Sequence, residues 1–300
     1  MGLNYPTGAL LAWSVRKRGL KAKNIVTIGK LEVNMSASQL RRIHKYMRLK
    51  EFDGEHNKWS ADQLLSFWLQ AAEVKSLDVS DYQGASIVHD LNNPVPDDLF
   101  ACCDLLIDGG CLEHVFNVPV ALVNYSKMVR LGGHVLIATT ANNYMGHGFY
   151  QFSPELFFSY FSKAKGFMIE YVGLAVHPFP SSSLSTGCQL YEVTDPTKAK
   201  GRIGLVSSTP ALILILVKRI SVENTDSENM IQSDYISLHE NNTKVGRAEK
   251  VIVRLIKNAV KALFPTWFVM YLKGMKELRW YSLRNKKAFR KHTLENWEVS

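Results

Sequence analysis

The sequence has 300 residues, of which 46% are hydrophobic, and a net charge of +9 at neutral pH. This length predicts one large domain with an appendage rather than two full domains. The longest apolar run, residues 210–217, is far too short to span a bilayer, and the four cysteines show neither zinc-site nor disulfide spacing. We therefore expect a soluble cytoplasmic protein with reduced thiols.

The N-terminal apolar run, residues 3–15, is followed rather than preceded by basic residues, which is the wrong order for a secretory signal. Charge is also divided unevenly along the chain. Residues 1–50 carry eleven basic and one acidic residue, residues 51–243 eleven basic and twenty-two acidic, and residues 244–300 fourteen basic and four acidic. The basic ends of the chain could bind a membrane face, a nucleic acid or an anionic glycan. Alternatively, they are solvated lysines on exposed helices.

Seven segments are rich in β-branched or apolar residues and end at glycine or polar residues. The strands expected from them are residues 24–29, 74–79, 85–89, 104–107, 135–140, 167–176 and 211–220. Helices are expected on residues 36–49, 60–72, 118–129 and 154–161, with Ser36 and Ser153 as N-caps. Gly132 and Gly133 turn the chain from the third helix into the next strand, which is the pattern of a right-handed βαβ unit.

This alternation predicts an α/β fold, a doubly wound and mostly parallel seven-stranded sheet over residues 24–220, after a weakly ordered or helical lead-in at 1–23. The long segment 177–210 is expected to be a functional loop or a lid. Residues 221–243 are polar and predict a linker. The basic tail, residues 244–300, has an apolar stripe that predicts two amphipathic helices broken near Pro265.

Acidic residues end three successive strands: Asp78, Asp90 and Asp108. A doubly wound sheet binds its ligand at the carboxyl ends of its strands, where the strand order reverses. A single acid at such a place is usually a solvated or capping residue. Three in succession favour a binding site.

Four strings stand out around these acids: SLDVSDYQGA (76–85), HDLN (89–92), DGGCLEHVFN (108–117) and GHGFYQFSPE (146–155). Together with the Leu-Gly-Gly turn at 131–133, they resemble class I S-adenosylmethionine (SAM)-dependent methyltransferases. Within that superfamily they look like a poorly characterised bacterial group whose members often have a single glycine in the first loop. The resemblance covers about residues 24–220 and implies a Rossmann-like methyltransferase fold with SAM as cofactor.

The resemblance also implies roles for individual residues. The Gly29 loop would approach the carboxypropyl group of SAM, and Asp78, or its neighbour Asp81, would accept the ribose hydroxyls. Asp90 would border the adenine edge, with Leu91 packed on the ring. The loop after the fourth strand, Asp108, Gly109 and Gly110, would approach the sulfonium.

The first loop departs from the family pattern, because Lys30 and Leu31 stand where small residues are expected. Two interpretations compete. Lys30 contacts the carboxylate of SAM and so replaces bare backbone amides, or the two side chains fill the pocket and leave a non-catalytic scaffold that acts as an interaction module.

The candidate groups on the acceptor side are His114, His147 and Tyr150. Histidine titrates near neutral pH and suits general-base work, whereas Tyr150 would exchange a hydrogen bond with the acceptor. Alternatively, His114 starts a helix and His147 occupies a turn. Glu113 is expected to orient the loop, and no metal site is predicted.

The sequence thus favours a SAM-dependent methyltransferase acting on a small-molecule or glycan-type acceptor. The segment 244–291 would dock on a protein or peripherally on the inner face of the membrane. No specific nucleic-acid module is recognisable.

Overall fold

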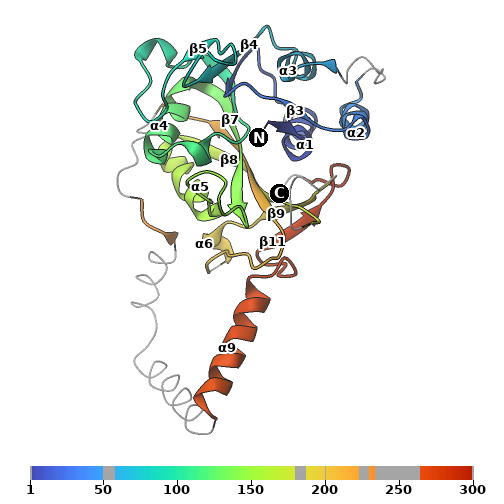
Figure 1. Ribbon diagram of the computed structural model, residues 1–300, viewed down its shortest axis with the longest axis vertical. Helices are drawn as coiled ribbons and strands as arrows, with labels where there is room; N and C mark the ends of the chain where they lie inside the picture. The colour runs from blue at the N-terminus through green and yellow to red at the C-terminus, as the bar shows by residue number, and fades with distance from the viewer. Residues whose placement is uncertain are drawn as a thin grey trace.

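The computed structural model describes residues 2–49, 58–179, 187–199, 201–222, 230–233 and 264–298. Its centre is a large sheet of nine strands among these residues, in the order β11-β9-β8-β10-β7-β6-β2-β4-β5 (Figure 1). The strands are β2 (Asn24–Ile28), β4 (Glu73–Asp78), β5 (Ile87–Val88), β6 (Cys103–Asp108), β7 (Val129–Asn142), β8 (Phe167–Val176), β9 (Gln189–Val193), β10 (Ala211–Arg219) and β11 (Phe289–His292).

The five strands from β5 to β7 are parallel, and β10 runs antiparallel between β7 and β8. The predicted α/β fold with a mostly parallel seven-stranded sheet is confirmed. Two further antiparallel strands extend this sheet at one edge. The first, β9, lies inside the segment predicted to be a long loop, and the second, β11, lies in the basic tail. The loop prediction for residues 177–210 is therefore wrong for Gln189–Val193.

The strand order reverses between β2 and β6. The chain runs outward from β2 through β4 to β5, then returns to place β6 on the other side of β2 and β7 beyond it. In an open α/β sheet, ligands bind in the crevice outside the carboxyl ends of the strands at this point. Gly29 follows β2 there, and Gly109 follows β6.

Helices cover both faces of the sheet (Figure 1). One face carries α1 (Tyr5–Trp13), α2 (Ala37–Met47) and α3 (Ala61–Leu69), and the other carries α4 (Val118–Met128) and α5 (Pro154–Tyr160). Ser36 and Ser60 cap α2 and α3 through complete capping boxes, and Ser153 caps α5. The predicted Ser36 and Ser153 caps are confirmed.

The remaining elements are short, apart from α9. They are β1 (Leu3–Asn4), β3 (Val33–Asn34), a π-helix (Ser14–Arg18), 3-10 turns (Asp97–Leu99, Leu112–His114, Lys163–Lys165), α6 (Pro196–Ala199) and α9 (Thr266–Trp280).

Each face of the sheet has its own apolar core. The side chains of β10 alternate between the two faces. Leu212, Leu214 and Leu216 pack on the side of α1 to α3, whereas Ile213, Ile215 and Val217 pack on the side of α4 and α5. This alternation follows from the two-residue period of a strand. A strand buried on both faces reads as a continuous apolar run, which is why the sequence identified it.

The N-terminal residues belong to the same core. Every residue of α1 is buried, and Leu3 N–H donates to the Glu32 carbonyl at 2.8 Å as β1 pairs with β3. This pairing brings Gly2 to the carboxyl end of β6. The predicted lead-in therefore lies against the switch point of the sheet.

The helix α9 extends away from the sheet (Figure 1), and none of its residues is buried. It corresponds to the second predicted tail helix, whereas the first lies outside the described residues, as does most of the predicted linker 221–243. At its end, Trp280 Nε1 donates to the Arg202 carbonyl at 3.0 Å. Among the described residues, no helix is long and apolar enough to cross a membrane.

Candidate functional site

The first part of the candidate site is formed by Gly29 and Asp78, at the ends of β2 and β4. Gly29 has a φ of 73°, and its N–H donates to the Leu77 carbonyl at 2.7 Å. A Cβ placed on Gly29 would stand 3.8 Å from Asp78 Oδ2, whereas Oδ1 accepts from the Val79 N–H at 2.7 Å. A bare backbone and a partly exposed carboxylate therefore adjoin at the ends of β2 and β4, and the nucleoside-binding role of this rim stays a prediction.

The side chains after Gly29 are occupied by the protein itself. Lys30 Nζ lies 2.6 Å from Asp62 Oδ2 in the first turn of α3. Leu31 is 6% exposed, and a Cβ placed on Gly109 would stand 2.8 Å from Leu31 Cδ2 and 3.3 Å from the Gly2 carbonyl oxygen. The Leu31 side chain and Gly2 therefore fill the space against Gly109 beside β6, whereas Asp78 at the end of β4 is partly exposed. The predicted contact of Lys30 with a cofactor carboxylate has a competing partner.

The residues after the third predicted strand hold their own loop. Asp90 Oδ1 accepts from the N–H and side-chain amide of Asn92, and Oδ2 accepts from the Asn93 amide at 3.2 Å. The bonds to Asn92 hold the pKa of Asp90 below its ordinary value. Leu91 is 4% exposed and lies in the core below α4. The prediction that Leu91 packs on an adenine ring is corrected, because its side chain faces inward.

Asp108 is completely buried at the end of β6. Its carboxylate accepts hydrogen bonds from the N–H groups of Gly110, Cys111 and Leu112, at 2.9, 2.7 and 3.1 Å, and from the Tyr125 hydroxyl at 2.8 Å. Burial raises its pKa, and these four bonds oppose that rise. The Asp108 carboxylate thus folds back to hold its own loop, with Gly110 at a φ of 113°, and the approach of this loop to the sulfonium stays a prediction.

Glu113 lies in the 3-10 turn after that loop and is also completely buried. Thr139 Oγ1 donates to Glu113 Oε2 at 2.7 Å, and Glu113 Oε1 makes no hydrogen bond. Burial, with a smaller contribution from Asp108, raises the pKa of Glu113 to about 7. A carboxyl group with such a pKa exists in both protonation states near neutral pH. Glu113 can therefore take up or release a proton, beyond the loop-orienting role predicted for it.

The segment 146–150 folds back onto Glu113. The Glu113 carbonyl accepts from the N–H groups of Phe149 at 2.7 Å and Tyr150 at 3.3 Å. Gly148 has a φ of 77°, and a Cβ there would stand 2.6 Å from that carbonyl oxygen. Only glycine allows this approach, which carries His147 over the buried carboxyl group.

The two predicted histidines meet at this point. Their ring centroids lie 5.1 Å apart, and His147 Nε2 lies 3.7 Å from Glu113 Oε1. Burial and the neighbouring His114 lower the pKa of His147. Tyr150 lies nearby, but its hydroxyl donates to the Phe116 carbonyl at 2.9 Å, so the predicted hydrogen bond to an acceptor has a competing partner.

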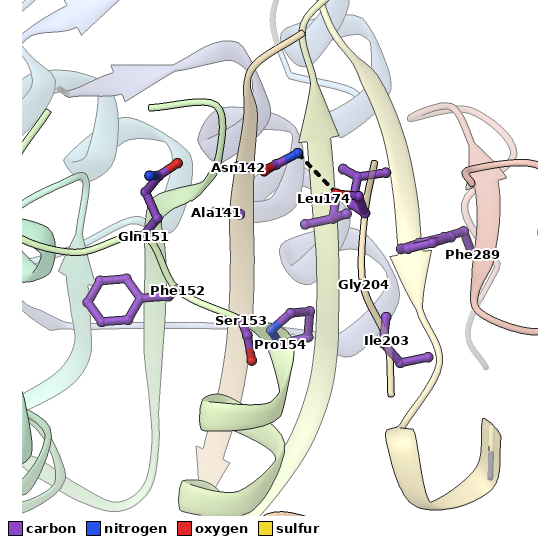
Figure 2. A pocket seen from close by; sticks show the side chains of 11 residues that line it. Ala141, Asn142, Gln151, Phe152, Ser153, Pro154, Leu174, Ile203, Gly204 and Phe289 are labelled. Carbon is purple, nitrogen blue, oxygen red and sulfur yellow. Dashed lines mark hydrogen bonds between the residues drawn. The ribbon is translucent and has the colours of Figure 1, made fainter. Parts of the chain in front are cut away.

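A separate cavity of about 170 Å³ lies at the end of β7 (Figure 2). Its walls are Ala141, Asn142, Gln151, Phe152, Ser153, Pro154, Leu174, Ile203, Gly204, Leu205 and Phe289. Asn142 donates its side-chain amide to the Leu205 carbonyl at 3.3 Å, which closes one wall. The volume is below that of ordinary ligand pockets, and these described wall residues include none of the predicted site residues.

Solved structures similar to the chain include methyltransferases crystallised with S-adenosylhomocysteine. One is the 1,6-didemethyltoxoflavin-N1-methyltransferase of Burkholderia thailandensis with bound 1,6-didemethyltoxoflavin and S-adenosylhomocysteine (12% identity, 72% of this chain and 77% of that chain, TM-score 0.36). Another is the N-methyltransferase NodS of Bradyrhizobium japonicum with S-adenosylhomocysteine (11%, 72% and 86%, TM-score 0.35). A third is the YcgJ protein of Bacillus subtilis (11%, 70% and 98%, TM-score 0.40).

No protein-family model matches the sequence, and no curated protein matches it. At these levels of identity and overlap, the likeness to solved structures concerns the fold alone. What the site does rests on its own residues.

Proposed function

We propose that this protein transfers a methyl group from SAM to a small-molecule or glycan-type acceptor. The observation that carries the proposal is the meeting of Gly29 and Asp78 at the switch point of the sheet. A Cβ would occupy the space over Gly29, and the carboxylate beside it can accept from two vicinal hydroxyl groups. These two features support a ribose that lies across the ends of β2 and β4.

SAM, when bound, supplies an activated methyl group on its sulfonium. The residues of this chain bind and orient: Asp78 accepts the ribose hydroxyls, and the loop after β6, which Asp108 holds rigid, lies on the other side of β2. Hydrogen bonds to a charged acceptor contribute about 1.5–3 kcal/mol each. Asp78 is therefore the residue on which nucleoside affinity depends most.

The acceptor would lie near the exposed rings of Phe116 and Phe149, which are 68% and 66% exposed and 5.7 Å apart between centroids. Such rings suit an aromatic or sugar ring. Beside them, His147 is partly exposed with a lowered pKa. The neutral imidazole can take a proton from the acceptor as the methyl group is transferred.

The test is methyl transfer from radiolabelled SAM into pools of small molecules and glycans from cell extract. Unmodified protein should label an acceptor, and Asp78→Ala should abolish the labelling. The comparison variant is Asp81→Ala, which removes the exposed acid three residues away that competes for this role and should keep full labelling if Asp78 binds the ribose. Equal labelling by Asp78→Ala would overturn the role of Asp78, and absence of labelling by unmodified protein in every pool would count against the enzyme.

A non-catalytic scaffold is the second candidate, favoured by the packing of Leu31 and Gly2 against Gly109. If the protein is such a scaffold, the Leu31 side chain fills the space that S-adenosylhomocysteine needs. Only a variant with a smaller side chain there, Leu31→Ala, would then bind this ligand. On the enzyme view, unmodified protein binds it already. Calorimetric titration of both proteins decides between the two.

We also propose that α9 holds the protein on the inner, cytoplasmic face of the membrane. Its large apolar side chains face solvent, among them Trp267 at 70%, Met270 at 68% and Tyr271 at 58% exposure. Lysine and arginine alternate with them, which suits an anionic lipid surface. Full-length protein should sediment with phosphatidylglycerol vesicles, and Trp267→Ser with Met270→Ser should release it. Retention on vesicles by this variant, or binding to a protein instead, would overturn the assignment.

A further inference from the structure

A cluster of potential metal ligands lies where the 3-10 turn after β6 meets the segment 146–150. It consists of Glu113, His114 and His147, each with one ligand atom within 4.8 Å of the others. Glu113 and His114 are adjacent in the first loop, and His147 lies in a second loop, 33 positions after His114. The fold, rather than a local sequence spacing, brings them together.

Two atoms in this cluster lack hydrogen-bond partners although they are buried. They are Glu113 Oε1 and His147 Nε2, which lie 3.7 Å apart. This separation is too long for a hydrogen bond. Two ligands at about 2.1 Å from one tetrahedral ion stand roughly 3.4 Å apart, so a single cation fits between these atoms with a small adjustment. A buried polar atom without a partner costs free energy, and a cation would remove that cost for both.

The cluster is held by groups that do not themselves point into it. Thr139 Oγ1 donates to Glu113 Oε2 at 2.7 Å, which fixes the carboxyl group and leaves Oε1 toward His147. The bond from Phe149 N–H to the Glu113 carbonyl, at 2.7 Å, holds the segment that carries His147. Partners of this kind orient the ligands in protein metal sites. His114 is exposed, so its ring can rotate onto a bound ion.

We infer that Glu113, His114 and His147 bind one divalent transition-metal cation of the Zn²⁺ type. Two imidazoles and one carboxylate form a donor set that suits Zn²⁺, Fe²⁺ or Mn²⁺ and disfavours Mg²⁺ and Ca²⁺, which prefer oxygen ligands. Three protein ligands leave a coordination position for water. Ligation occupies the Nε2 lone pair of His147, so the general-base role proposed for this imidazole holds only for the metal-free protein.

The test is Zn²⁺ binding by chelator-treated full-length protein, measured by competition with a chromogenic zinc chelator and without SAM or S-adenosylhomocysteine. We expect one equivalent to bind. His147→Ala and Glu113→Gln should each weaken binding at least tenfold, and Thr139→Val should weaken it by about tenfold through the orientation of Glu113. The matched control, His89→Ala, removes a histidine outside the cluster and should bind as the unmodified protein does.

Glu113→Gln changes a buried group, so circular dichroism of each variant must match that of the unmodified protein. His147 lies in a partly exposed turn, and its variant keeps the inference testable if Glu113→Gln does not fold. Substoichiometric binding by unmodified protein, or unchanged binding by His147→Ala, would overturn the inference. Because the measurement needs no cofactor, its failure is separate from a failure of S-adenosylhomocysteine to bind.

Discussion

Replacing Asp108 distinguishes a residue that holds a loop from one that contacts a cofactor. The carboxylate is fully buried and accepts four hydrogen bonds, three from backbone N–H groups and one from the Tyr125 hydroxyl. In Asp108→Asn, an amide NH₂ replaces one oxygen, and it faces the Leu112 N–H and the Tyr125 hydroxyl. At least one donor then loses its acceptor, and the other bonds lose the negative charge.

The cost can be estimated from these contacts. A hydrogen bond to a charged group contributes about 1.5–3 kcal/mol, and a buried donor without a partner costs about 1–3 kcal/mol. We expect Asp108→Asn to lower the free energy of unfolding by about 3 kcal/mol. Tyr125→Phe should lower it by about 1.5 kcal/mol, because Asp108 keeps its three backbone donors.

Urea denaturation followed by tryptophan fluorescence measures both variants, and the double variant tests their coupling. Because the Tyr125 hydroxyl donates to Asp108, we expect the two effects not to add. S-adenosylhomocysteine affinity is measured on the same proteins under conditions in which all are folded. An unfolding midpoint for Asp108→Asn equal to that of unmodified protein, with affinity reduced more than tenfold, would refute the loop-holding role.

Two further predictions concern stability. Burial lowers the pKa of His292 to about 4, so the folded protein keeps a neutral imidazole where the unfolded chain, with a pKa of about 6.5, takes up a proton. The free energy of unfolding should therefore fall by up to roughly 3 kcal/mol as the pH drops from about 6.5 to about 4, and urea denaturation of His292→Gln should show a smaller fall over that range. Gly109→Ala should lower the free energy of unfolding by about 1–3 kcal/mol, because the new Cβ meets Leu31 Cδ2 at 2.8 Å. Adding Leu31→Ala should cost less in this background than in the unmodified protein, and a strictly additive pair would contradict the contact.

The sequence predicted the inner strands well because they are buried on both faces. Residues 211–217 of β10 form a continuous apolar run, and such a run has few alternatives to a central strand. The edge strand β11 has the sequence FRKH, and two of its four residues are exposed and basic. Its pairing with β9 joins segments about a hundred residues apart, and no local pattern encodes such a contact.

Some residues of the candidate site could likewise be predicted from the sequence, and others could not. Gly29 and Asp78 were predicted as candidates because Gly29 directly follows a strand and Asp78 ends one, and parallel strands bring their ends to one edge. The sequence cannot say whether a strand-end acid turns toward the crevice or back to its own loop, and Asp108 turns back. Thr139 and the segment 146–150 bury Glu113, and both are distant from it in sequence. The proximity of Glu113 to His147 could therefore not be predicted from the sequence.

The central claim is that the rim formed by Gly29 and Asp78 binds the nucleoside of SAM. Calorimetric titration of the folded full-length protein with S-adenosylhomocysteine tests it most directly. We expect one equivalent to bind, and Asp78→Asn to weaken binding by about tenfold to a hundredfold, the equivalent of one or two hydrogen bonds to a carboxylate. Asp81→Asn should leave the affinity unchanged. Folded protein that releases no heat of binding, or that binds equally well with Asp78→Asn, would contradict the claim.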